Sequence, residues 1–179
     1  SEISYSLTKS GIIDSVGAES ATCAATAKKL GLVEDFACRM MSAGASLKLL
    51  SATPTGVYTL SDAGDLLRTD HPGSLRSFML MINEESKESW RAAGTKSLET
   101  GTSGFKQHFG SEFWDWHSGI GHGRQMAQFD SAMKSFSAEI SGSLLVDWKP
   151  PTSKAVVCDV GGGVVCPLAT RTPFVELPI

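Results

Sequence analysis

The chain has 179 residues, of which 41% are hydrophobic and 20% charged, and its net charge is −3. This length fits one good-sized domain, or one domain and a fragment of another, and the composition is ordinary for a soluble globular protein. The negative charge disfavours a nucleic-acid binder, and no apolar run approaches the roughly 20 residues needed to cross a bilayer. The first ten residues, SEISYSLTKS, contain neither an initiator Met nor an apolar signal core, which predicts a processed or partial chain.

The spacing of cysteines and histidines indicates no redox or metal centre. Neither C-x-x-C spacing nor the density of a disulfide framework is found among the four cysteines, Cys23, Cys38, Cys158 and Cys166. This predicts buried free thiols in a reducing compartment, either the cytoplasm or an organelle interior such as the plastid stroma after processing. The histidines include His117 and His122 but form no H-x-x-x-H or H-E-x-x-H pattern, so no metal site is predicted.

Three helices are predicted at the start of the chain. Apolar spacing favours a helix over residues 3–16, and an Ala-rich segment favours a second helix over 19–30 that Gly31 ends. A third helix is predicted over residues 33–43. Its expected core-facing stripe comprises Val33, Phe36, Ala37, Met40 and Met41.

A β-hairpin is predicted next, in SLKLLSATPTGVYTL, where two short β-type runs flank a Thr-Pro-Thr-Gly turn. Ser61 is then the expected N-cap of a helix that runs through Leu67. Three helices and a hairpin are the order of a winged helix, whose usual function is DNA binding. The third helix would face the phosphates with Glu34 and Asp35 against a lone Arg39, which is unfavourable. We therefore expect no nucleic-acid partner.

Two long amphipathic helices are predicted in the second half of the chain, over residues 74–98 and 124–146. Between them, GTSGFKQHFG predicts a glycine-rich break, and FWDWH and a second glycine cluster, GIGHG, follow. The Met and aromatic faces of the two helices fit either a partner surface or packing inside one subunit. Residues 148–151 predict a linker, and AVVCDVGGG then predicts a buried strand that ends in a glycine turn.

Four stretches of the chain match, in order, the segments of one enzyme family. GIIDSVGAESATCAATAKKLGL is similar to opening helices, and VYTLSDAGDLLRTDHPGSLR is similar to a wing strand and the helix after it. SWRAAGTKSLETGTSGFKQHFGSEFWDW resembles a segment that ends in an "fG-e-fw" loop, and FDSAM with VVCDVGGGV resembles a last helix and a first cofactor motif. The family they resemble is the class I, S-adenosylmethionine-dependent O-methyltransferases of the plant caffeate and bacterial hydroxyneurosporene type.

The resemblance implies a mainly α fold with two domains. Residues 1–150 would form a winged-helix-like dimerisation and acceptor-pocket domain that includes the long helices, and 151–179 a truncated remnant of the Rossmann-like, S-adenosylmethionine-binding domain. Carried over by position, the cofactor-binding residues are Asp159, Gly161, Gly162, Gly163 and Glu176. The residues carried over to the wall of the pocket for an aromatic acceptor are Phe129, Met133 and His117.

The sequence departs from the family after the glycine turn. Val165 replaces a fourth glycine, and VCPLATRTP, which two prolines interrupt, is too short for the helix expected there. This tail is either a truly shortened motif, or a frame change or splice difference that resembles the motif by chance. Because no catalytic base matches the family pattern, we expect no catalytic residue and no bound cofactor in the chain as given.

The predicted function is a non-catalytic dimerisation, scaffold or assembly subunit derived from a methyltransferase, either as a homodimer or within a larger complex. The alternative is a fragment or truncated record of an active O-methyltransferase that uses S-adenosylmethionine on a phenolic or polyketide-like hydroxyl. In either case apolar helix residues are expected to be buried mainly by another chain or by the tail. These residues are Ile3, Leu7, Ile12, Ile13, Phe78, Met79 and Ile82.

Overall fold

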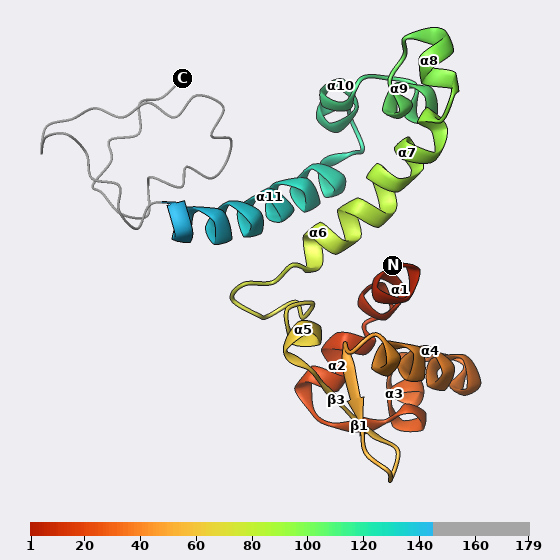
Figure 1. Cartoon of the computed structure of the whole chain (residues 1–179), viewed down its shortest axis with the longest axis vertical. Helices are drawn as coiled ribbons and strands as arrows, with labels where there is room; N and C mark the ends of the chain where they lie inside the picture. Colours follow the sequence, from red (N-terminus) through yellow and green to blue (C-terminus); the bar gives the residue numbers. More distant parts are fainter. Residues whose placement is uncertain (145–179) are drawn as a thin grey trace, which may run out of the picture.

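The computed structural model describes the backbone of residues 1–144 and the side chains of residues 1–137. A helical unit with a small sheet lies at one end, and further helices, of which α11 (Gly123–Leu144) is the longest, extend from it (Figure 1). The first unit consists of α1 (Glu2–Lys9), α2 (Ile12–Ala18), β1 (Ala21–Thr22), α3 (Cys23–Leu30), α4 (Glu34–Ser46), β2 (Leu50–Ala52), β3 (Val57–Leu60) and α5 (Asp62–Asp65). The predicted mainly α, winged-helix-like fold is confirmed for this part of the chain.

Of the two opening helices of the prediction, the first is interrupted in the structure and the second begins later than expected. Residues 3–16 form two helices rather than one, because Gly11 adopts a left-handed conformation (φ 82°) between them. The helix predicted over 19–30 begins only at Cys23, since Ala21 and Thr22 pair with β3 and the Thr22 hydroxyl accepts a hydrogen bond from the Ala25 amide. Gly31 ends that helix in the left-handed conformation, as predicted.

The predicted hairpin is confirmed as strands β2 and β3 of a three-stranded antiparallel sheet with the order β1-β3-β2. Ser61 caps α5 as expected, because its hydroxyl accepts a hydrogen bond from the Gly64 amide at 3.1 Å. The helix ends at Asp65 rather than at Leu67. Leu67 lies after the end of α5 and belongs to the buried core of this unit.

The core of this unit is assembled entirely from its own elements. Its buried hydrophobic members are Leu7, Ile12, Ile13, Val16, Met41, Leu50, Tyr58 and Leu67. The prediction that another chain or the tail mainly buries Leu7, Ile12 and Ile13 is therefore wrong, since these residues are only 0–2% exposed inside this cluster.

Helix α4 presents a different face to the core than the sequence suggested. Ala37 and Met41 are buried, and Gly44 continues the same face against Leu7. Val33 and Phe36 are 67% and 65% exposed, so the predicted stripe is wrong at these two positions. Val33 precedes the helix as its N-cap residue, and the 37–41–44 line follows the i, i+4, i+7 pattern of a single helix face.

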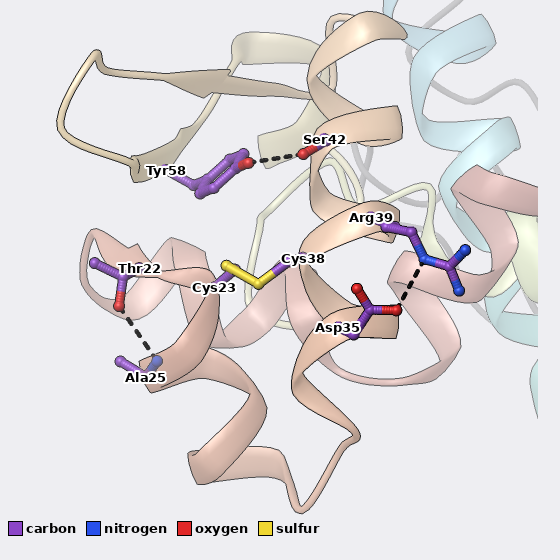
Figure 2. The surroundings of a disulfide bond; sticks show 8 residues. All are labelled: Thr22, Cys23, Ala25, Asp35, Cys38, Arg39, Ser42 and Tyr58. Carbon is purple, nitrogen blue, oxygen red and sulfur yellow. Dashed lines mark hydrogen bonds and ion pairs between the residues drawn. A yellow bond between two sulfur atoms is a disulfide. The ribbon is translucent and has the colours of Figure 1, made fainter.

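A disulfide bond joins Cys23 at the start of α3 to Cys38 in the middle of α4 (Figure 2). The prediction of free thiols is therefore wrong for these two residues, and the cysteines no longer support a reducing compartment. Spacing alone did not show the pair, because the residues become neighbours only when α3 and α4 pack together. Cys158 and Cys166 lie outside the described residues.

Breaking this disulfide should lower the free energy of unfolding by about 3 kcal/mol, because the bond closes a loop across a sequence separation of 15. Urea unfolding of the Cys23→Ala/Cys38→Ala double variant measures the effect, and Cys158→Ala/Cys166→Ala serves as the matched control. A reducing agent should destabilise the wild type and the control to the level of the first variant. If the wild type has the same stability with and without reducing agent, the bond is not present in solution.

The second part of the chain is a set of helices that begins with one long rod. The rod consists of α6 (Arg76–Met81), the π-helical turn η1 (Ile82–Ser86) and α7 (Lys87–Ala93), and it is followed by α8 (Lys96–Thr100), α9 (Gly104–Phe109), α10 (Phe113–Ser118) and α11 (Gly123–Leu144). The predicted 74–98 helix ends at Ala93 because Gly94 reverses the chain (φ 36°, ψ −142°). GTSGFKQHFG, predicted as a break, contains α9, which the Ser103 hydroxyl caps. The second long helix is confirmed as α11 as far as Leu144, its last described residue.

The rod is tied to the winged-helix-like unit by charged side chains. Arg76 pairs with Asp14 at 3.2 Å and donates to the Thr8 carbonyl oxygen at 2.8 Å, and Glu84 pairs with Lys9 of α1. These contacts hold the π-helical turn of the rod beside α1.

Apolar contacts inside the chain also cover part of the expected subunit boundary. Phe78 of α6 lies 4.8 Å from Phe136 of α11, and Ile3 and Met79 pack against the core cluster. Ile82 is half-buried. Their contacts with another chain stay a prediction. Among residues 1–144 no helix is both long and apolar enough to span a membrane.

Candidate functional site

Helices α9, α10 and α11 bring a group of aromatic rings together around His117. Ring centroids of Phe113, Trp116, Phe129 and Phe105 lie 4.1, 4.9, 5.8 and 5.9 Å from the centroid of the His117 imidazole. His117 is 2% exposed, whereas the four surrounding rings are only half-buried. We call these five residues the aromatic cluster. The cluster thus combines four partly exposed apolar rings with one buried polar ring, the imidazole of His117.

Helix α9 can approach α7 closely because Gly104 has no side chain. A Cβ atom at this position would lie 2.1 Å from the Ser89 carbonyl oxygen and 2.8 Å from the Ala93 Cβ. The close approach carries Phe105 to the cluster from the following position of α9. The glycine-rich segment therefore has a packing role in shaping this site.

His117 is fixed by hydrogen bonds at both ring nitrogens. Nδ1 donates to the carbonyl oxygen of Phe113 at 2.9 Å, and Nε2 lies 2.9 Å from Oε2 of Glu85. Because a carbonyl oxygen can only accept, Nδ1 carries a proton and one further proton lies between Nε2 and Oε2. The pair is thus held together either as imidazolium and carboxylate or as imidazole and carboxylic acid.

The π-helical turn places two consecutive glutamates in different surroundings. Glu84 accepts from Tyr5 at 3.2 Å and from Gln128 at 3.3 Å, and it pairs with Lys9, so it joins α1, the rod and α11. Glu85 is 5% exposed and turns toward α10, where it meets His117. Single π-helical turns inside α-helices are frequent at functional sites, and this one carries the buried carboxylate.

The two glutamates also differ in their electrostatics. Burial raises the pKa of Glu85 above its ordinary value of 4.5, and Glu84 adds to the rise, while His117 and His122 act in the lowering direction. For Glu84, partial burial acts to raise the pKa, but hydrogen bonds from Lys9 and Gln128 and the Lys9 charge hold it below the ordinary value. Glu85 is therefore the carboxylate whose charge is costly in this region.

Several buried polar atoms near the α10–α11 junction have no hydrogen-bond partner within the described part of the chain. They are Oε1 of Glu85, Nδ1 of His122 and Oε1 of Gln125. The His122 ring lies 3.9 Å from the Trp116 ring, centroid to centroid. Most buried polar atoms in proteins are paired with protein or with ordered water, so each of these three atoms is available to a water molecule or a ligand.

The structure brings together two of the three predicted pocket residues. Phe129 and His117 both belong to the aromatic cluster, and Met133 lies half-buried one turn further along α11. Their role in acceptor binding stays a prediction. The predicted cofactor residues, Asp159, Gly161, Gly162, Gly163 and Glu176, lie outside the described residues. In residues 1–144 no three His, Cys, Asp or Glu side chains gather as a metal site would require.

Sequence reasoning missed Glu85. It lies in the middle of a stretch whose pattern predicts only an amphipathic helix, and its partner is 32 residues away. The one available signal was the pair of acidic residues in MLMINEES, directly after an apolar run. Such a pair is usually a solvated helix face, and no helical period predicts the π-helical turn that sends the two side chains to different neighbours.

The chain is similar in sequence to small-molecule methyltransferases, and its fold is similar to theirs. The O-demethylpuromycin-O-methyltransferase of Streptomyces alboniger is 29% identical over 163 residues, which are 90% of this chain and 43% of that protein. No protein-family model matches the chain.

Solved structures show the same fold. The N,N-8-amino-8-demethyl-D-riboflavin dimethyltransferase RosA from Streptomyces davawensis superposes with a TM-score of 0.73 at 24% identity, covering 82% of this chain and 44% of that one. CalO1, a methyltransferase in calicheamicin biosynthesis solved in its SAH-bound form, gives a TM-score of 0.70 at 24% identity and covers 90% of this chain and 47% of that one. The chain thus spans less than half the length of these relatives.

Proposed function

We propose that residues 1–144 are the acceptor-binding and subunit-pairing part of a methyltransferase that acts on an aromatic small molecule. The observation that carries this proposal is that the sequence similarity to methyltransferases covers 90% of this chain and the fold similarity covers 82–90% of it. The aromatic cluster supports it, since half-exposed rings offer the flat apolar faces that an aromatic acceptor would contact.

Subunit pairing is supported by an apolar groove between α1, α2 and α4. The groove has a volume of about 330 Å³, and its exposed rim includes Val33 and Phe36. An exposed apolar surface of this kind is typical of a protein–protein contact. We propose that a second copy of the chain covers it in a homodimer.

In the proposed reaction S-adenosylmethionine supplies the methyl group, and the described residues bind and orient the acceptor. The rings of the aromatic cluster exclude water from one side of the acceptor, and Phe129 and Met133 contact its faces. The aromatic cluster would promote group transfer by orienting the acceptor and by excluding water from it. The acceptor is an aromatic hydroxyl or amine, in line with the O- and N-methyltransferases to which the chain is similar.

The test is a methyl-transfer assay on the polypeptide encoded by the complete reading frame, with methyl-labelled S-adenosylmethionine and a panel of aromatic hydroxyls and amines. Transfer of label to one or more compounds is expected, and light scattering should give the mass of a dimer. A variant with Phe129→Ala and Met133→Ala should raise the KM for the acceptor more than it lowers kcat. Binding of S-adenosylmethionine without transfer to any aromatic compound would overturn the proposal.

A second candidate is a non-catalytic dimerisation or assembly subunit. The departure of residues 164–175 from the family's cofactor motif, with Val165 in place of a glycine and two prolines after it, favours this candidate. It predicts a stable dimer that shows no calorimetric binding of S-adenosylmethionine in the same preparation. Binding in the micromolar range would exclude it and favour the enzyme.

A further inference from the structure

We propose that Glu85 is a specificity-determining residue of the acceptor site, which selects aromatic molecules that carry an O–H or N–H donor directed at its free oxygen. This inference rests on the proposed function and names the chemistry of its ligand. Glu85 accepts or shares the His117 proton through Oε2, whereas Oε1 has no partner among the described residues although it is buried. The free oxygen is therefore a hydrogen-bond acceptor without a donor.

The surroundings of Glu85 favour recognition over a purely structural role. A carboxylate that serves only the core would be expected to have both oxygens satisfied, because an unpaired buried acceptor costs roughly 1–3 kcal/mol. The neighbouring Glu84 shows the satisfied case, with one oxygen accepting from Tyr5 and Lys9 and the other from Gln128. Glu85 lies on the same π-helical turn, yet one of its oxygens is left free beside the aromatic cluster.

His117 acts as a positioning residue for this carboxylate. Its Nδ1–H bond to the Phe113 carbonyl oxygen fixes the ring plane, so Nε2 can meet only Oε2 and leaves Oε1 for a ligand. The half-buried rings of Phe113 and Phe129 lie next to each other on one side of the imidazole, with 5.2 Å between their centroids. A flat ligand that packs against these rings and carries a donor on its edge would supply the partner that Oε1 lacks among the described residues.

A neutral pair of probes tests the idea: 2-naphthol, which has an O–H donor, and 2-methoxynaphthalene, which has the same rings without the donor. Calorimetry on the full 179-residue chain should show that 2-naphthol binds at least about tenfold more tightly than 2-methoxynaphthalene. This is the effect expected of one hydrogen bond to a charged group. If the wild type binds both probes equally, the inference is wrong whatever the variants show.

Two variants separate recognition from folding. Glu85→Leu removes the acceptor and should reduce the preference for 2-naphthol to less than about threefold. The double variant Glu85→Leu/His117→Leu should reduce it equally, and it avoids leaving a buried imidazole without a hydrogen-bond partner. Glu84→Gln, on the same turn, is the matched control and should keep the tenfold preference. Retention of the preference in both Glu85 variants would overturn the inference.

The outcome is distinguishable from failure of the proposed function. Methyl transfer by the complete protein together with equal binding of the two probes would leave the proposed function standing and remove only the role of Glu85. A preference for the donor-bearing probe that depends on Glu85, without methyl transfer to any aromatic compound, would support the role of Glu85 in binding and overturn the proposed methyltransferase function. No binding of either probe would remove the role of Glu85.

Discussion

Replacing His117 with leucine should lower the free energy of unfolding by about 3–5 kcal/mol at pH 7, because it leaves the Glu85 carboxylate buried without its partner. Replacing both residues with leucine should cost at least about 2 kcal/mol less than the single change, since an apolar pair leaves no charge to desolvate. Urea unfolding measures both values. His108→Leu, a similar change at an exposed position of α9, should cost less than about 0.5 kcal/mol.

The cost of His117→Leu should also depend on pH. Burial already raises the pKa of Glu85 in the folded protein, and loss of His117, which acts in the lowering direction, raises it further. Between the unfolded pKa near 4.5 and this raised value, the folded state binds more protons than the unfolded state, so stability falls as pH rises. The difference in free energy of unfolding between the wild type and His117→Leu should therefore shrink as the pH falls from 7 toward 4.5. A deficit that does not change over this range would mean that Glu85 is not a buried charge in the variant.

Local signals in the sequence predicted the elements of the winged-helix-like unit well. Gly31, the Thr-Pro-Thr-Gly turn and Ser61 each act through their nearest neighbours, and each ends or begins an element as expected. Gly11 was missed because a glycine inside a helical pattern is compatible with a continuous helix as well as with a break. The break follows from the packing of α1 and α2 into one core, and no local signal reports it.

The candidate site depended on contacts that are far apart in the sequence. The resemblance placed Phe129 and His117 in a pocket wall, and the structure brings them together. Glu85 could not be added from the pattern, because its role arises from a π-helical turn and a partner on another helix. The Cys23–Cys38 bond was missed for the same reason, since two thiols 15 positions apart show their pairing only when two helices pack.

The exposed Phe36 and the buried Met41 allow a direct test of how α4 is oriented. Met41→Ala should lower the free energy of unfolding by about 2–5 kcal/mol, because loss of this fully buried side chain would leave a cavity in the core cluster. In the monomeric chain Phe36→Ala should lower the free energy of unfolding by less than about 1 kcal/mol, since the ring is mostly exposed. What it loses is the solvent-exposed contact with the Arg39 guanidinium, which lies 4.4 Å from the ring centroid.

The measurement is urea unfolding of both variants and the wild type at two protein concentrations. A low cost for Phe36→Ala is expected at the lower concentration, where the chain is a monomer, and the proposed homodimer predicts a cost that grows with protein concentration because a second copy covers the groove on α4. The Met41→Ala cost should exceed the Phe36→Ala cost in either case, because its cavity forms inside one chain. If Phe36→Ala proves the more damaging change at low concentration, α4 is turned with its predicted stripe inward and the described packing of this helix is wrong.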